Sequence, residues 1–309
     1  LLKFKMDDKI LVTATLRPET IIGAINIWLN PYIEYIEVDA EGEHWIITKE
    51  AHHNLKHQIK DLNIIREVDP NDLIGGFVEN PFTGDKLPIF PASFVSGSYG
   101  SGVVFSEPAD APADYIALQD LKNNKELIAK YHLEDIIDDV NPINVCSVKG
   151  YGEIPAAEII EKLGIKDQND PKLHDATNEL YKVEHRKGII SEHIPEYGGK
   201  KVAIAREEFK ADMIDKNMAT TMYDFAERPV ICRCGEDCVV KIMDNQWFLK
   251  YSDEEWTAKT HEVLNGETII PKEVKNNFEY YIDWLDDWAC SRNVGLGTRL
   301  PWDNQWLIE

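Results

Sequence analysis

The segment TATLRPETIIGA, residues 13–24, places three threonines, an arginine, a proline and a glutamate directly after an alternating apolar run. Hydroxyl, guanidinium and carboxylate groups at the end of a strand can hold a polar ligand and position water. Pro18 lacks a backbone donor and disfavours helical geometry at Arg17, so we expect the strand to end there. The same residues also suit a simple turn from strand to helix, with Thr20 as a capping residue.

A second segment whose residues could take part in chemistry is GSYGSGVVFSEPADAPADY, residues 97–115. It predicts a glycine loop, a short strand and then the start of a helix. Glycines let a backbone approach a ligand closely, and Asp110 and Asp114 would follow that loop on the helix start. Two structural alternatives stay open: Asp110 as the N-cap of the helix, and Asp114 as a first-turn acid that complements the helix dipole.

Together the two segments resemble the editing domain, called connective peptide 1, of the leucyl-, isoleucyl- and valyl-tRNA synthetases. The element T-x-R-P-E-T is shared by all three specificities. The form GSGVV followed by P-x-D-A-P-x-D is similar to leucyl enzymes of the archaeal and eukaryotic type, and so is the tail DWACSRNVGLGTRLPWDNQW, residues 287–306. The resemblance covers essentially the whole chain. It implies a mixed α/β fold, with a curved or closed β-barrel editing domain and flanking helices.

The resemblance implies roles for single residues. Asp114 corresponds to the aspartate that pairs with the α-ammonium of the substrate, and Thr15 to a threonine that positions water or the ester. Thr20 corresponds to the threonine that limits the size of the pocket. Arg17 is either a contact to phosphate or ester or a structural brace of the loop.

The glycine loop and its surroundings show both agreement with the family and departures from it. Gly100, Ser101 and Gly102 correspond to the loop whose backbone holds the terminal adenosine, although the family usually has threonine at Ser101. Asp110 stands where many archaeal relatives have histidine, which leaves open whether it is a cap or a second carboxylate of the site. Glu107 replaces a usual valine. Leu16 replaces a threonine of bacterial relatives, and its place on the apolar face of the run predicts a structural role.

The activity implied by the resemblance is hydrolysis of the aminoacyl ester of tRNA-Leu that carries isoleucine, valine, methionine or a similar amino acid. Such an ester is already activated, so neither a nucleophilic triad nor a metal is required, and we expect no cofactor for editing. ATP and Mg²⁺ would serve only the parent enzyme, because the H-I-G-H and K-M-S-K-S signatures do not occur in these 309 residues. The implied partners are the 3′ end of tRNA-Leu, the mischarged amino acid and the parent catalytic domain. The alternative is a structural insert that binds the tRNA end without turnover.

The cluster CRCGEDC offers Cys232, Cys234 and Cys238 as zinc candidates. A structural zinc site takes four ligands, and the nearest further candidates are His261, far along the chain, and Cys290. The paired C-x₂-C spacing is also missing. The sequence therefore favours a turn with small cysteines and no metal.

Composition limits the class of protein. The formal charge of −22 argues against broad contact with a nucleic-acid backbone, although a pocket for one nucleotide end remains compatible with it. No apolar run reaches the ~20 residues of a membrane span. The sparse cysteines suggest reduced, intracellular use, so we expect a cytoplasmic protein without membrane partners. The first residues, without Met or a signal pattern, suggest an excised fragment.

Periodicity predicts an N-terminal part rich in strands and a C-terminal part rich in helices. Alternation indicates strands in KILVTATL (9–16), INIWLN (25–30), HWIITK (44–49), LPIFPASFV (87–95) and GVVFS (102–106). Helical spacing begins near residue 110 and continues in IPAAEIIEKLG (154–164), KLHDATNELYKVEHRKG (172–188), AREEFKADMIDKNM (205–218) and NNFEYYIDWLDDWA (276–289).

The same pattern suggests two parts of the chain. We assign residues 1–226 to the editing domain and residues 227–309 to the connection back toward the catalytic domain, and we expect exposed apolar surface on the last helix.

Overall fold

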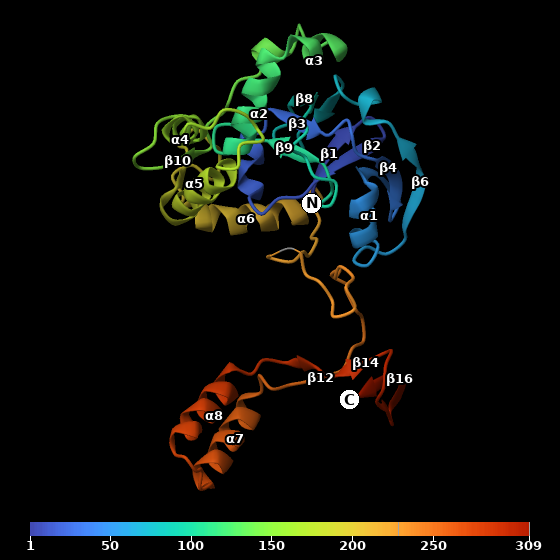
Figure 1. The fold of residues 1–309 in the computed structure, drawn as a ribbon, viewed down its shortest axis with the longest axis vertical. Coiled ribbons are helices and arrows are strands. Elements are labelled where there is room, and N and C mark those ends of the chain that lie inside the picture. Colours follow the sequence, from blue (N-terminus) through green and yellow to red (C-terminus); the bar gives the residue numbers. More distant parts are fainter. Residues whose placement is uncertain (228, 309) are drawn as a thin grey trace. The chain divides into compact units, whose positions relative to one another are not determined.

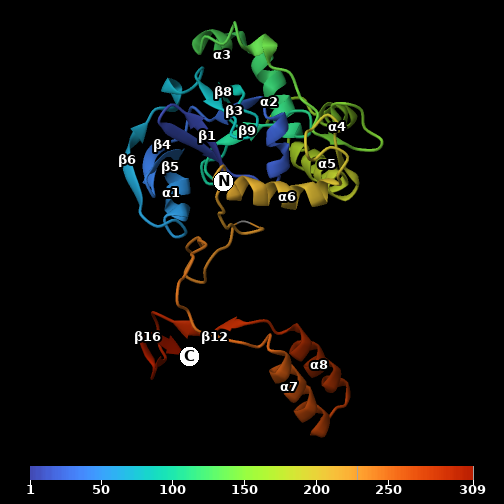
Figure 2. The ribbon, with the colours of Figure 1, turned by 180° about the vertical axis from the view of Figure 1, so that it is seen from behind.

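A computed structural model describes residues 1–227 and 229–308 (Figures 1 and 2). It divides into two compact units, Leu1–Lys241 and Ile242–Glu309, called here unit 1 and unit 2. This division lies C-terminal to the boundary at 226/227 that we drew from the sequence, and the assignment of the two parts to editing and connection stays a prediction. None of the helices in the described residues has the length and apolar content that crossing a bilayer requires.

Unit 1 is built on a mixed sheet of nine strands, in the order β6-β4-β5-β2-β1-β7-β8-β3-β9. The pairs β2–β5 and β3–β8 are parallel, and the other neighbours are antiparallel. The strands are β1 (Leu2–Met6), β2 (Lys9–Thr13), β3 (Asn26–Leu29), β4 (Tyr35–Ala40), β5 (Glu43–Thr48), β6 (Leu62–Val68), β7 (Phe77–Glu79), β8 (Lys86–Pro91) and β9 (Val104–Ser106).

The predicted mixed α/β class is confirmed, but of the two forms expected for the barrel, curved or closed, the closed form is wrong. Within the described residues its ends are β6 and β9, and these two strands do not pair with each other. The reason lies in the short β9, which ends at Ser106. Pro108 and the helix start that follows carry the chain out of the sheet, so no long strand is left to close it.

The helices of unit 1 follow and flank the sheet (Figure 1). They are α1 (Lys49–Leu55), α2 (Pro112–Asn123), α3 (Lys125–Lys130), α4 (Pro155–Leu163), α5 (Leu173–Lys187) and α6 (Val202–Asp215). Short 3-10 turns cover Pro18–Gly23, Pro70–Asp72 and Ile137–Asp139, and the small pair β10 (Cys146–Ser147) and β11 (Ile189–Ile190) lies among these helices. Helix α4 ends at a C-cap glycine, since Gly164 is left-handed with φ 64°.

The core of unit 1 gathers apolar side chains from the sheet and from the helices. Trp28, Phe4, Phe90 and Phe209 are all fully buried in one cluster, which α6 joins through Phe209. Strand β3 is buried on both faces, since all four of its residues are buried. This burial fixes the position of β3, and with it one wall of the candidate site.

Unit 2 is smaller. It contains α7 (Glu254–Gly266) and α8 (Glu273–Trp284), which pack on each other, and the short strands β12 (Phe248–Leu249), β13 (Trp288–Ala289), β14 (Ser291–Arg292), β15 (Thr298–Leu300) and β16 (Asp303–Ile308). The last expected helix is shorter than its periodicity suggested. It ends at Trp284, and Trp288 lies in β13, paired with Leu249.

Candidate functional site

The first sequence segment forms a strand end followed by a tight turn. Strand β2 stops at Thr13, and a 3-10 turn runs from Pro18 to Gly23. The Arg17 backbone N–H donates to Thr15 Oγ1 at 2.8 Å, and Thr20 Oγ1 donates to the Arg17 carbonyl at 2.8 Å. Thr20 is therefore not the N-cap of the turn, because Arg17 holds that position and Thr20 lies inside the turn.

Leu16 corrects the sequence interpretation. The alternation over 9–16 placed it on the apolar face, yet its side chain is 83% exposed. Because β2 ends three residues earlier, the two-residue period no longer applies at this position. Leu16 therefore has no packing role in this structure.

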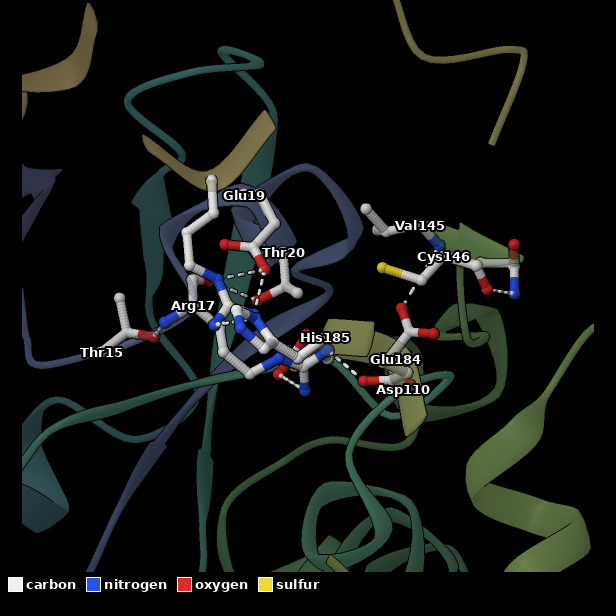
Figure 3. A network of polar contacts seen from close by, with 12 residues as sticks. Thr15, Arg17, Glu19, Thr20, Asp110, Val145, Cys146, Glu184 and His185 are labelled. Atoms are coloured by element: carbon white, nitrogen blue, oxygen red, sulfur yellow. Dashed lines mark hydrogen bonds and ion pairs between the residues drawn. The ribbon is translucent and has the colours of Figure 1, made fainter. Parts of the chain in front are cut away.

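Arg17 is buried and makes ion pairs to two different parts of unit 1 (Figure 3). Its Nη1 lies 3.0 Å from Glu107 Oε1, and its Nη2 lies 2.6 Å from Glu184 Oε2 on α5. The guanidinium carbon also lies 4.0 Å from the ring centroid of Tyr181. Of the two roles that the sequence left open, these contacts are those of a structural brace.

Asp114 lies in the first turn of α2 and is buried. Its Oδ1 accepts from Trp28 Nε1 at 3.1 Å, and its Oδ2 accepts from the Glu107 backbone N–H at 2.9 Å. Burial raises the pKa of Asp114 from 3.8 to about 7, although both hydrogen bonds oppose this shift. The carboxyl group thus titrates near neutrality and is fixed by strand β3 and by the turn before α2.

Asp110 is fully buried and is not the helix cap. The N-cap position belongs to Ala111, which makes no side-chain capping bond. Asp110 Oδ2 instead accepts from the Val145 backbone N–H at 3.3 Å, and burial raises its pKa to about 6. Its contacts are with the segment before β10, so this carboxylate joins α2 to the helical part of unit 1 (Figure 3).

The glycine loop is packed against Ala14, which follows β2, and against Thr48, the last residue of β5. A Cβ on Gly100 would lie 2.4 Å from Ala14 Cβ, and one on Gly102 would lie 2.2 Å from Thr48 Cγ2. Both glycines have positive φ, 62° and 75°. The Ser101 carbonyl accepts from the Thr48 backbone N–H at 3.0 Å. Close packing therefore explains these glycines, and it places the loop beside the residue that precedes Thr15.

The structure thus brings the sequence-predicted residues into two adjoining groups. Arg17, Thr20, Asp110 and Asp114 lie in one buried polar network, which Glu107 connects. The glycine loop touches the chain just before Thr15. Among the predicted residues Thr15 is partly exposed, and the others are buried.

Sequence reasoning missed several members of the network. Glu184 and Tyr181 come from α5, and Arg206 of α6 donates to buried Glu19 from both Nε (3.0 Å) and Nη2 (2.7 Å). One signal was available for Glu184: it lies four residues after buried Leu180, on the apolar face of the helix. A charged side chain at such a position requires a buried partner.

Carboxyl groups outnumber guanidinium groups in this network. Burial raises the pKa of Glu184 to about 8 and that of Glu107 well above its ordinary value, while Arg17 pulls both in the opposite direction. Burial therefore favours the neutral form of these two carboxyl groups, whereas their ion pairs with Arg17 favour the ionised form. Carboxyl groups on an exposed acidic surface differ in this respect, because no burial raises their pKa.

The cysteine cluster forms a different kind of region. Cys232 and Cys234 are exposed, and a β-bridge joins Ile231 to Asp237 around a turn. Among the described residues, no three His, Cys, Asp or Glu side chains are placed to hold a metal ion. Cys238 lines a cavity of about 630 Å³ together with residues of α1 and the segment 222–240. None of the sequence-predicted residues of the buried network lines this cavity.

Comparison with known proteins identifies a family that both motif segments match. Residues 2–135 match the family described as "Leucyl-tRNA synthetase, editing domain", so the match includes both motif segments. Over its whole length the chain is 59% identical to a leucine–tRNA ligase of Methanothermobacter thermautotrophicus, of which it covers 33%. The chain spans about a third of the length of the curated relatives it matches.

Solved structures share the fold. The crystal structure of GlLeuRS-CP1 superposes with a TM-score of 0.63 at 24% identity, covering 71% of this chain and 86% of that chain. The crystal structure of the P.falciparum cytosolic leucyl-tRNA synthetase editing domain gives a TM-score of 0.60 at 23% identity. The superposition covers 69% of this chain and 78% of that chain. At these identities the likeness establishes the architecture alone.

Proposed function

Because residues 2–135 belong to the leucyl-tRNA synthetase editing-domain family, we propose that this chain is the editing part of such an enzyme. It hydrolyses the ester bond of tRNA-Leu that carries isoleucine, valine, methionine or a similar amino acid. The observation that carries the proposal is the single family match across both motif segments, whose residues also meet in one network.

Asp114 binds the α-ammonium of the mischarged amino acid. Each carboxylate oxygen has more than one acceptor site, so the bonds to Trp28 and Glu107 leave room for a further donor. A cation beside Asp114 favours the ionised form and lowers its pKa from about 7. Binding of the substrate thus coincides with loss of a proton from this carboxyl group.

Thr15 positions the attacking water at the partly exposed edge, and Thr20 limits the depth of the pocket. Gly100, Ser101 and Gly102 present backbone groups to the terminal adenosine. Arg17 acts as a structural brace, because its backbone bonds to the hydroxyl groups of Thr15 and Thr20. Editing uses no cofactor in this proposal, because an aminoacyl ester needs only a placed water and donors for the developing oxyanion.

The remaining assignments concern the whole enzyme. ATP and Mg²⁺ act in the catalytic domain of the parent protein, outside this chain. The partners are the 3′ end of tRNA-Leu and that catalytic domain, and the location is the cytoplasm.

Deacylation of tRNA-Leu charged with isoleucine tests the proposal directly. The chain should hydrolyse it, although weakly, because a protein of charge −22 lacks a broad basic surface for the tRNA body. Asp114→Asn should lower kcat/KM by roughly 10- to 100-fold, the equivalent of one charge-assisted hydrogen bond. Asp120→Asn, on the same helix but bonded to Gln168, is the matched control.

Binding of the tRNA end without hydrolysis would instead support a structural insert. Asp114→Ala is a poor probe of this question. It leaves Trp28 Nε1 and the Glu107 N–H buried without their acceptor, at a cost of about 1–3 kcal/mol for each group. A first-turn acid that only complements the helix dipole would lose less, about 0.3–1 kcal/mol.

Thr20→Ala tests the pocket wall. If the threonine stops leucine from entering, the variant should hydrolyse correctly charged tRNA-Leu and keep its activity on the isoleucyl ester. The steric contact of Thr20 would account for about 1–3 kcal/mol of discrimination between the two esters. An unchanged ratio of the two rates would reduce Thr20 to its hydrogen bond with the Arg17 carbonyl.

A further inference from the structure

Helix α5 holds the guanidinium of Arg17 with two side chains. Glu184 Oε2 lies 2.6 Å from Arg17 Nη2, and the Tyr181 ring lies under the guanidinium carbon at 4.0 Å. These two residues are three positions apart, so they share one face of α5. The Glu184 side chain has no exposed surface, which leaves it no alternative partner in water (Figure 3).

The backbone of Arg17 in turn holds both threonines of the turn. Its N–H donates to Thr15 Oγ1 at 2.8 Å, and its carbonyl accepts from Thr20 Oγ1 at 2.8 Å and from the Thr20 N–H at 3.1 Å. A displacement of Arg17 therefore moves both hydroxyl groups.

Glu107 extends the same connection to the carboxylate. Its Oε1 accepts from Arg17 Nη1 at 3.0 Å, and its N–H donates to Asp114 Oδ2 at 2.9 Å. Arg17 thus lies between α5 on one side and Thr15, Thr20 and Asp114 on the other. Helix α5 lies beyond residue 135, where the family match ends.

We propose that Glu184 and Tyr181 are positioning residues for editing, which act through Arg17 to fix the hydroxyls of Thr15 and Thr20. The proposal rests on the proposed function and adds a part of the chain, the α5 helix, on which the rate depends. Neither side chain touches the substrate. Both set the place of groups that do, and small displacements of such groups reduce rates strongly.

The first experiment compares Glu184→Gln with Glu179→Gln in the full chain. Glu179 lies on the same helix and makes an exposed ion pair with Lys162, so it is a matched control. Glu184→Gln should lower kcat for isoleucyl tRNA-Leu about tenfold while KM changes less than twofold. Hydrogen exchange at the Arg17 and Thr20 amides should become about tenfold faster. Glu179→Gln should change none of these values.

A double-mutant cycle separates positioning from a general loss of stability. If Glu184 acts through Arg17, then Glu184→Gln should lower kcat little further in an Arg17→Lys background. Tyr181→Leu, which removes the ring but no charge, should reproduce the fall in kcat and the faster exchange, and it serves if Glu184→Gln does not fold.

Three results would overturn the proposal. The first is unchanged exchange at Arg17 and Thr20 in Glu184→Gln, and the second is faster exchange with an unchanged kcat. The third is an additive double-mutant cycle. A wild-type chain without deacylase activity would refute the proposed function instead, and the exchange experiment would then decide by itself whether α5 fixes the turn.

Discussion

Units 1 and 2 bury their aromatic residues to very different degrees. In unit 1, Trp28, Phe4 and Phe90 are fully buried, and even charged groups such as Glu184 have no exposed surface. In unit 2, neither α7 nor α8 has a buried residue among those described, and Trp284 is 65% exposed. An exposed stripe of Phe278, Tyr281 and Trp284 fits the expectation from the sequence. Unit 1 therefore contains the core that stabilises it, whereas unit 2 carries apolar surface suited to further contacts.

The largest expected effect comes from two tryptophans. Trp28→Ala should lower the free energy of unfolding of unit 1 by about 3–5 kcal/mol, because it removes a fully buried ring and the donor to Asp114. Trp284→Ala should change the stability of unit 2 by less than about 0.5 kcal/mol. Urea denaturation followed by hydrogen exchange in each unit measures both. Equal losses would remove the contrast between the units.

Two glycines with similar backbone angles test close packing in unit 1. Gly102→Ala should cost about 2–4 kcal/mol, because the new Cβ would lie 2.2 Å from Thr48 Cγ2 and φ is 75°. Gly84→Ala has φ 76° and no atom within 4 Å, so it should cost only about 1 kcal/mol. Thermal unfolding of the two variants would compare them. A similar loss in both would mean that the glycine loop is not tightly packed.

The two units should respond to pH with opposite signs. In unit 1, burial raises the pKa of Asp110 to about 6, of Asp114 to about 7 and of Glu184 to about 8. The folded state then binds more protons than the unfolded state, so the stability of unit 1 should fall as pH rises from about 4 to 8, by at most about 1.4 kcal/mol per pH unit for one group.

In unit 2, hydrogen bonds lower the pKa of Asp253 and Asp287, and stability should instead fall when pH drops below their ordinary value of 3.8. Hydrogen exchange across a pH series would resolve the two units. Asp114→Asn should flatten the slope of unit 1 between pH 4 and 7, and an unchanged slope would contradict the assigned role of burial.

The smallest effect is expected at an exposed apolar residue of unit 1. Leu16→Ala should change the free energy of unfolding by less than about 0.5 kcal/mol, since the side chain is 83% exposed. Leu11 is fully buried in β2, so Leu11→Ala should lower the free energy of unfolding by about 2–5 kcal/mol. Chemical denaturation distinguishes them easily. A large loss at Leu16 would restore the structural role that its alternation suggested.

The elements of unit 1 were predictable where they have a local cause. Alternation marked β2, β3, β5, β8 and β9, and helical spacing marked α2, α4, α5 and α6, whereas β1, β4, β6 and β7 and the short helices α1 and α3 were not predicted. Closure of the sheet was not predictable in this way, since it depends on which distant strands pair. The period also failed at Leu16 and at Trp288, where the chain leaves its regular element.

For the candidate site, the sequence by itself predicted which residues carry the chemistry, and their roles stay predictions. The threonines, Arg17 and Asp114 belong to two short segments that lie within residues 2–135, the range that matches the leucyl-tRNA synthetase editing-domain family. Only the tertiary structure decided how these groups are held. Glu184, Tyr181 and Glu19 with Arg206 are distant in sequence from their partners, and a buried ion pair leaves no local pattern beyond a charge at an apolar position. Burial depends on the packing of the whole unit, so the raised pKa of Asp114 and the bracing role of Arg17 appear only once α5, β3 and the turn before α2 have come together.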